Sequence, residues 1–221
     1  MPRLVVHFLI VMFLHQGGNL MAETENEGER AVRRWLSTNA GVEALKVEFT
    51  QTRKLTSLKS VIRQRGVLWL DRRKGTKFRW QTGHPPRTIV TRVDDELLVM
   101  RTRSRQYEKS PAGETRNSMA ILARGFPQSW EEFQQKYQLM GVSSEGGRDR
   151  INVQPKGALA QGIRVLTFVT GSTNGILQSV DLTLRDGSSQ QIVFDKVHTG
   201  PELNENIFDP DLTGYRATNF K

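Results

Sequence analysis

Side chains that commonly perform catalysis are scarce and scattered in this chain. It contains no cysteine, which excludes disulfides, thiol nucleophiles and cysteine-ligated metal or iron–sulfur sites. After the first 22 residues, the remaining histidines are His84, which precedes a proline, and His198, which ends a predicted strand. Neither belongs to an HExxH, HxxxH or Ser-His-Asp pattern. We therefore interpret both histidines as surface residues.

Two acidic groups could supply an acid and a base for catalysis. Asp94-Asp95-Glu96 and Asp209-Pro210-Asp211 both fall in predicted turns, where acidic side chains are favoured for backbone reasons. The glycine-rich GxGxxG and GxxxxGK[ST] patterns that hold nucleotide phosphates are missing from the sequence. These observations predict a protein that is not an enzyme and that uses neither a cofactor nor a metal.

Positive charge is concentrated in one part of the chain. The 221 residues include 32 Lys+Arg and 23 Asp+Glu, and residues 53–109 hold 16 of the basic and 5 of the acidic ones. A polyanion could bind such a segment, but no nucleic-acid motif is present, so we expect no nucleic-acid partner. For an exported protein, anionic lipid headgroups or an acidic protein are favoured partners. The alternative is a solvated basic face of a half-buried sheet.

The first 22 residues have the features of a secretory signal peptide. Arg3 precedes an apolar run over residues 4–14 that only His7 interrupts, and Ala22 suits the position before cleavage. The run is too short to cross about 30 Å of hydrocarbon comfortably. We expect export to the periplasm, with residues 23–221 forming one domain. A short membrane anchor, or translation that starts at Met21, are the alternatives.

The body of the chain is predicted to be mainly β with short helices. Val32, Trp35 and Leu36 have helical spacing within residues 29–36, whereas apolar residues alternate with polar ones from Val47 onward. Even spacing of the strands predicts an antiparallel sheet in meander order. The predicted strands are residues 47–52, 61–70, 77–81, 88–93, 97–102, 106–108, 137–142, 150–154, 163–170, 176–184 and 190–198.

Local signals mark the connections between these elements. A helix is expected at 117–124, and the capping-box pattern Ser129-Trp130-Glu131-Glu132 predicts the start of another. Asn174-Gly175 and Asp186-Gly187 predict tight hairpin turns. The tail at 206–212 is irregular but apolar enough to dock on the rest of the chain.

A series of short motifs occurs in a fixed order along the chain. They are Phe49-Thr50-Gln51, Gly66-Val67-Leu68-Trp69-Leu70-Asp71-Arg72, Phe78-Arg79-Trp80, Pro85-Pro86, Ile89-Val90, Asp94, Ile121-Leu122-Ala123-Arg124 and Leu203…Ile207-Phe208…Pro210. This ordered series resembles the LolA-type family of periplasmic outer-membrane lipoprotein carriers. The chain departs from the family pattern at Asp95, at Arg73-Lys74-Gly75-Thr76 and at Pro210-Asp211-Leu212.

The resemblance implies an incomplete, half-open β-barrel, in which short helices cover a curved antiparallel sheet. It further implies a monomeric carrier that holds the acyl chains of lipoproteins in an apolar cavity. Such a carrier receives them from an inner-membrane releasing transporter and delivers them to an outer-membrane acceptor. Other hypotheses are a lipoprotein or lipid sensor of the same fold that acts through a partner protein, a polyanion-binding protein and, least favoured, an unrecognised hydrolase.

The family fold implies which residues face the cavity. Phe78 and Trp80 share one strand face, as do Leu166 and Phe168, because side chains alternate along a strand. Ordinary core packing is the alternative for these residues. In the family, the arginine that follows Gly-x-Leu-Trp closes the helical lid by hydrogen bonding, and Arg72 holds that position here; a surface arginine is the alternative. The expected cavity residues are Phe49, Leu68, Phe78, Trp80, Val90, Met119, Leu122, Leu166 and Phe168.

Overall fold

The structure, a computed structural model, describes residues 26–58, 60–111 and 126–218. The leader and the predicted helix at 117–124 lie outside this part of the chain. The described elements are α1 (Glu27–Asn39), β1 (Ala44–Lys54), β2 (Val61–Asp71), β3 (Lys77–Thr82), β4 (Thr88–Val93), β5 (Glu96–Arg101), β6 (Gln106–Pro111), α3 (Trp130–Lys136), β7 (Tyr137–Glu145), β8 (Arg148–Pro155), η1 (Gly157–Gln161), β9 (Ile163–Gly171), β10 (Leu177–Leu184), β11 (Ser189–Thr199), η2 (Glu205–Phe208) and β12 (Arg216–Ala217).

All described strands belong to one curved sheet in the order β12-β6-β5-β4-β3-β2-β1-β11-β10-β9-β8-β7. It consists of two meanders, β1–β6 and β7–β11, which join where β1 pairs with β11 and Phe49 lies opposite Phe194. The pairing is antiparallel except between β12 and β6, which are parallel. Because β7 and β12 lie at opposite edges, the sheet is unclosed, and the predicted half-open barrel is confirmed.

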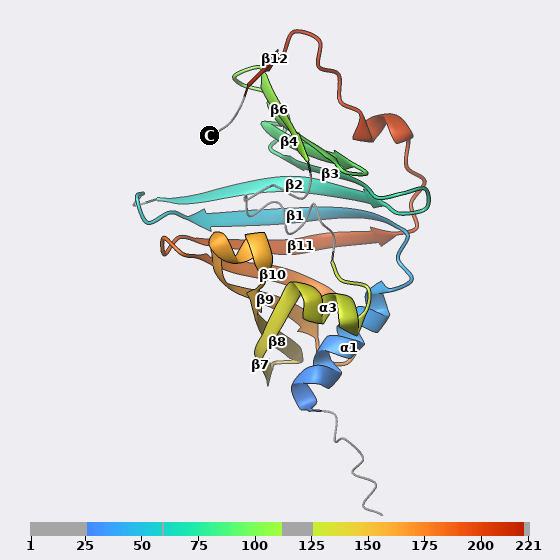
Figure 1. Ribbon diagram of the computed structural model, residues 1–221, viewed down its shortest axis with the longest axis vertical. Coiled ribbons are helices and arrows are strands. Elements are labelled where there is room, and N and C mark those ends of the chain that lie inside the picture. Colours follow the sequence, from blue (N-terminus) through green and yellow to red (C-terminus); the bar gives the residue numbers. More distant parts are fainter. Residues whose placement is uncertain (1–25, 59, 112–125, 219–221) are drawn as a thin grey trace, which may run out of the picture.

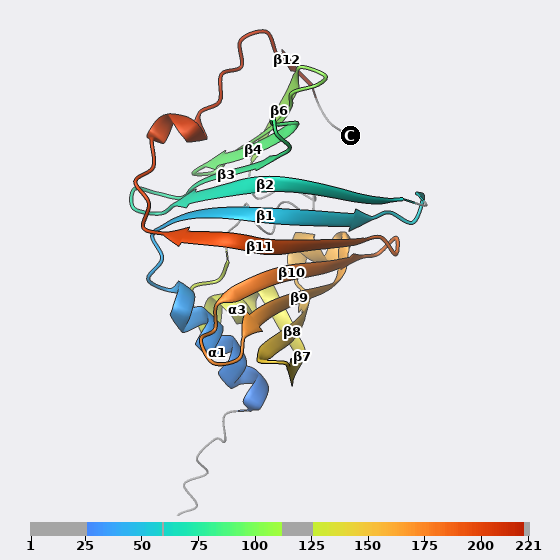
Figure 2. The same cartoon turned by 180° about the vertical axis from the view of Figure 1, so that it is seen from behind.

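The short helices α1 and α3 cover one half of the sheet on a single face, called the helix face here (Figures 1 and 2). Asn26 caps α1 by accepting a hydrogen bond from Gly28 N at 3.0 Å. Ser129 Oγ caps α3 by accepting from Glu132 N at 3.1 Å, while Glu132 Oε2 accepts from Gln128 N at 2.7 Å. The predicted cap of α3 is therefore confirmed, although Glu132 reaches one residue beyond Ser129. None of the helices in the described ranges is long and apolar enough to span a membrane.

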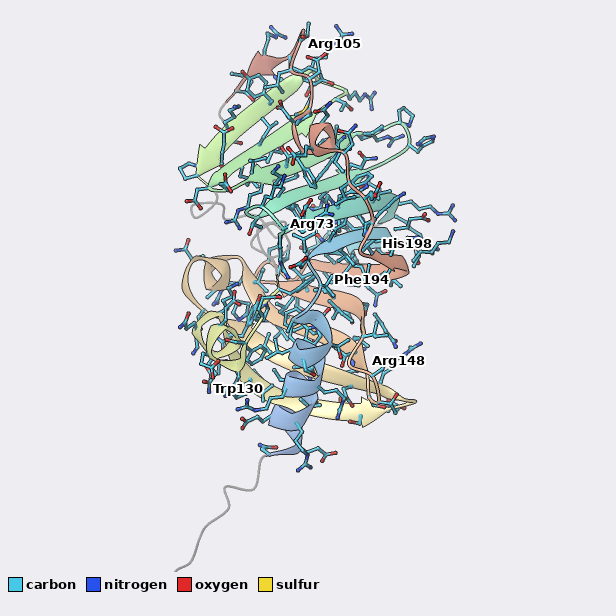
Figure 3. All side chains as sticks on the ribbon, turned by 90° about the vertical axis from the view of Figure 1, so that its right-hand side faces the viewer. Arg73, Arg105, Trp130, Arg148, Phe194 and His198 are labelled. Carbon is cyan, nitrogen blue, oxygen red and sulfur yellow. The ribbon has the colours of Figure 1, made fainter. Side chains whose placement is uncertain are left out.

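The opposite face, called the outer face, is partly covered by a C-terminal strap, residues 201–218, which runs past β3 and β4 to β12 (Figures 1 and 3). Phe208 is buried, and Arg79 Nη1 donates a hydrogen bond to Ile207 O at 2.7 Å. Farther along, Leu212 and Tyr215 pack on a small cluster of Ile89, Leu98 and Met100. The predicted docking of the tail is therefore confirmed.

Candidate functional site

Most of the residues predicted to face a cavity are buried together on the helix face. They belong to one hydrophobic cluster, called the apolar cluster here, and each is at most 3% exposed. Met119 and Leu122 lie outside the described residues. The seven that the structure brings together are Phe49, Leu68, Phe78, Trp80, Val90, Leu166 and Phe168.

Strand register explains why these side chains meet. Leu68, Trp80 and Val90 lie opposite one another on β2, β3 and β4, so all three point to the same face. Phe49 on β1 lies opposite Gly66, where an added Cβ would come within 2.2 Å of Phe49 Cζ. The ring of Phe49 therefore crosses the space that Gly66 leaves open. It stacks on Trp80 with 3.7 Å between ring centroids.

The helices add aromatic rings that sequence reasoning did not assign to the site. Trp35 of α1 lies 4.4 Å from Phe168 between ring centroids. Its ring also meets Phe126 and Phe133 edge-on, at 6.2 and 6.3 Å. The helical spacing of Trp35 in the sequence was a usable signal for a residue that faces the sheet. Together these rings form a roof over the apolar cluster.

Polar contacts fix α1 to the sheet. Arg34 Nη2 donates to Asp149 Oδ2 of β8 at 2.5 Å, and the Asp149 side chain is only 2% exposed. Ser144 Oγ donates to the other oxygen of that carboxylate at 2.7 Å. Thr38 Oγ1 donates to Asn174 O in the turn between β9 and β10 at 2.7 Å. Side-chain hydrogen bonds from Arg34 and Thr38 therefore hold the α1 part of the roof against the sheet.

By contrast, α3 is attached by packing and by contacts near its C-terminal end. Lys156 N donates to Lys136 O at 2.9 Å, and Lys156 Nζ donates to Gln134 O at 2.7 Å. Near its start, the guanidinium of Arg33 lies 5.1 Å from the ring centroid of Trp130, which Figure 3 labels. Among the described residues, one side-chain hydrogen bond from the sheet, that of Lys156, reaches α3, whereas two join α1 to the sheet.

Arg72 lies just past the end of β2, where its N–H donates to Glu43 O at 2.7 Å. Burial lowers the pKa of Arg72, and the negative charge of Glu132 on α3 raises it. Its guanidinium makes no hydrogen bond with any described residue, so the structure links it to α3 through charge. The next residue, Arg73, instead forms a bidentate pair with Asp71 at 3.0 and 2.7 Å on the surface.

The ionisation state of Glu132 determines how strongly it attracts Arg72. Burial raises the pKa of Glu132, but hydrogen bonds from Lys136 Nζ and Gln128 N, together with the charges of Lys136 and Arg72, lower it overall. Glu132 is therefore held in its ionised form at neutral pH. An ionised Glu132 attracts Arg72 and favours the position of α3 seen here.

The residues considered for catalysis lie apart from this face or are paired. His84 and His198 are exposed, as predicted. Glu96 pairs with Lys109 at 2.8 Å, and Asp95 lies 3.7 Å from an Arg92 nitrogen. Within the part of the chain that the structure describes, no three His, Cys, Asp or Glu side chains gather where they could hold a metal ion.

Comparisons with known proteins give both a family and a fold. The sequence profile of the family described as outer membrane lipoprotein carrier protein LolA matches residues 40–211. No curated protein sequence matches the chain. An uncharacterized conserved protein from Thermus thermophilus is similar in structure, with a TM-score of 0.53, 8% identity and coverage of 87% of this chain and 99% of that one. A DUF1329 family protein from Desulfovibrio piger has a TM-score of 0.51, 12% identity and coverage of 82% and 95%.

These structural similarities are distant and show the fold alone. The family match is made on the sequence itself, and residues 40–211 include every strand from β1 to β11 together with α3. The unclosed sheet is the one that the motif series implied. On this evidence the chain belongs to the LolA family of outer membrane lipoprotein carrier proteins.

Proposed function

We propose that this protein binds the acyl chains of lipoproteins on its helix face and carries them through the periplasm from the inner to the outer membrane. The observation that carries the proposal is the apolar cluster, which spans both meanders of the sheet and has a roof of short helices. Membership of the LolA family supports it. Under this proposal, the predicted cavity residues are those that an acyl chain contacts.

The aromatic roof explains how binding could be firm and still reversible. Burying an acyl chain stabilises the complex by about 0.8 kcal/mol per CH₂ group. In this structure, Phe133 of α3 and the neighbouring Phe126 cover part of the apolar cluster. An incoming acyl chain takes the place of their rings when α3 moves outward, and it loses that place when α3 returns. Competition between cargo and roof thus limits the affinity and permits delivery.

A transfer assay tests the carrier role. The purified mature protein is incubated with donor vesicles that contain a synthetic triacylated lipopeptide, and soluble complexes are collected and mixed with acceptor vesicles. We expect the protein to extract the lipopeptide in soluble form and to release it to the acceptor. Failure to extract it would overturn the proposal. Extraction without any release, with or without an acceptor protein from the outer membrane, would favour the sensor hypothesis instead.

Two matched variants separate binding from core stability. Phe133→Ala removes part of the roof, whereas Met100→Ala removes a side chain of similar burial from the outer face. We expect Phe133→Ala to raise the rate of lipopeptide uptake, because its ring no longer competes with the acyl chain. Met100→Ala should leave the rate unchanged, although both variants destabilise the fold. Equal effects of the two variants would show that the apolar cluster is only core.

A further inference from the structure

The helix face changes from apolar to polar along six neighbouring strands, β1–β5 and β11. Along β1, Phe49 is followed on the same face by Gln51 and then Arg53. Strand register places Gln64 of β2 opposite Gln51 and Gln190 of β11 opposite Arg53. Thr82, Thr88 and Arg101, on β3, β4 and β5, lie level with Phe49. The corresponding steps run from Trp80 to Thr82 on β3, from Val90 to Thr88 on β4, from Val99 to Arg101 on β5 and from Ile192 to Gln190 on β11.

These polar residues line a cavity of about 370 Å³ that adjoins the apolar cluster. Trp80 and Val90 belong to both. Three polar lining residues, Gln51, Thr82 and Gln190, are each at most 5% exposed. The wall of the cavity is therefore polar, although the neighbouring surface of the sheet is apolar.

The cavity is positively charged. Arg53 and Arg101 are its charged lining residues, and no Asp or Glu lies among the described residues that line it. The guanidinium of Arg53 makes no hydrogen bond or ion pair with any residue in the described ranges. The indole Nε1–H of Trp80 is buried and likewise has no hydrogen-bond partner there. The Arg53 guanidinium and the Trp80 N–H are therefore donors that could bind an anionic oxygen of a ligand.

We propose that this cavity binds the phosphate of an anionic glycerophospholipid, whose headgroup carries no cation of its own, while the acyl chains lie on the adjoining apolar cluster. The proposal rests on the proposed function, because acyl chains must be able to enter beneath the roof. It extends the cargo beyond lipoproteins to anionic phospholipids. The acyl linkages of a triacylated lipoprotein carry no negative charge, so the two arginines are better matched by a phosphodiester.

Lipid-exchange experiments test the assignment. The mature protein is incubated with vesicles of dioleoyl phosphatidylglycerol or of dioleoyl phosphatidylcholine, separated from them, and its bound lipid is quantified by mass spectrometry. We expect roughly tenfold more phosphatidylglycerol to be retained, in line with one charge-assisted contact. Arg53→Gln and Arg101→Gln should each remove most of this preference. Arg63→Gln, on the outer face of β2, should preserve it and thereby controls for net charge.

Each outcome bears on a different claim. If wild-type protein retains both lipids equally, the headgroup site is wrong while acyl binding stands. If it retains neither lipid and also fails to extract the lipopeptide, the proposed function fails first. Displacement of phosphatidylglycerol by an equal concentration of inorganic phosphate would show a site for free phosphate and overturn the lipid assignment. Thermal unfolding of the two arginine variants confirms that any loss of binding occurs in folded protein.

Discussion

Arg72 at the end of β2 and Glu132 on α3 carry opposite charges, and each influences the pKa of the other. Burial makes an isolated guanidinium costly, and the negative charge of Glu132 offsets part of this cost. The pair thus favours the position of α3 in which the roof is closed. If closing expels cargo, as we propose, the attraction assists delivery and not uptake.

Arg72→Leu should accept the lipopeptide normally but deliver it roughly fivefold more slowly, since about 1 kcal/mol that favours closure is lost. The measurement is the rate of transfer from preformed complexes to acceptor vesicles. Arg73→Leu, which breaks only a surface pair with Asp71, is the control and should transfer normally. Wild-type transfer by Arg72→Leu, and also by the double variant, would rule out the lid role.

The lowered pKa of Glu132 makes its contribution to stability pH-dependent. The ordinary value is 4.5 and the folded value lies below it, so the contribution is complete above pH 4.5 and is lost as the pH falls through the folded value. Glu132→Gln keeps the shape but removes the charge. Urea unfolding of both proteins should therefore show a stability advantage of wild type at pH 7 that shrinks below pH 4.5. An advantage that stays constant with pH would contradict the electrostatic account.

Among the elements, α1 approaches the turn between β9 and β10 so closely that the turn can hold only glycine. Gly175 has a φ of +65°, and an added Cβ would lie 2.5 Å from Arg34 O. Gly187, in the turn between β10 and β11, has a similar φ of +84°, but there an added Cβ would lie 3.3 Å from Thr56 Cγ2. The two turns therefore share backbone strain but differ in contact with a helix.

Gly187→Ala should lower the free energy of unfolding by about 1 kcal/mol through backbone strain alone. Gly175→Ala should lower it by about 3 kcal/mol, because α1 must also shift away from the turn. Urea titration measures both values. Equal losses would mean that α1 is not held tightly against this turn.

The strands and their faces were predictable because their signals are local. Period-two alternation located every strand from β1 to β11, within a few residues at the ends, and Ser129 marked the start of α3. The two-residue β12 and the short η1 and η2 were missed, although the tail that holds η2 was predicted to be irregular. None of the three has a hydrophobic period of its own, and β12 exists only because the strap lays Arg216 and Ala217 beside β6.

The site was predictable only in part, because local signals locate a strand face but not the contacts between distant elements. Alternation showed that Phe78 shares a face with Trp80, and the resemblance indicated which face is covered. The ring contacts of Trp35 with Phe126 and Phe133 depend on how two helices settle on the sheet. The polar cavity depends on the register of six strands at once, which no local pattern reveals.

At the scale of the whole molecule, the strap shields the outer face of β3–β6 as the helices shield the opposite side. Ile89, Leu98 and Met100 are buried beneath it, and Lys77 lies 3.4 Å from Glu205 at its start. Its absence would leave a contiguous apolar patch, and such patches promote association. The strap therefore covers a patch that would otherwise favour self-association.

A chain that ends at Gly200 lacks the strap and should self-associate, as measured by sedimentation velocity at micromolar concentration. Extraction of lipopeptide should persist in its soluble fraction, because the helix face is intact. Replacing Leu98 and Met100 of the shortened chain with serine should reduce association. A shortened chain that sediments as a stable monomer would show that the strap has no such role.

The junction of the two meanders also constrains how the protein is made. Thr50 of β1 hydrogen-bonds Asp195 of β11, 145 residues later. Bringing such distant segments together costs chain entropy that nearby contacts cannot repay, which slows folding. Under the export that we propose, β1 emerges early with one edge unpaired and keeps it until β11 has crossed the membrane. For that interval the partly exported chain would be an open template for aggregation, and its yield would depend on how quickly the last third arrives.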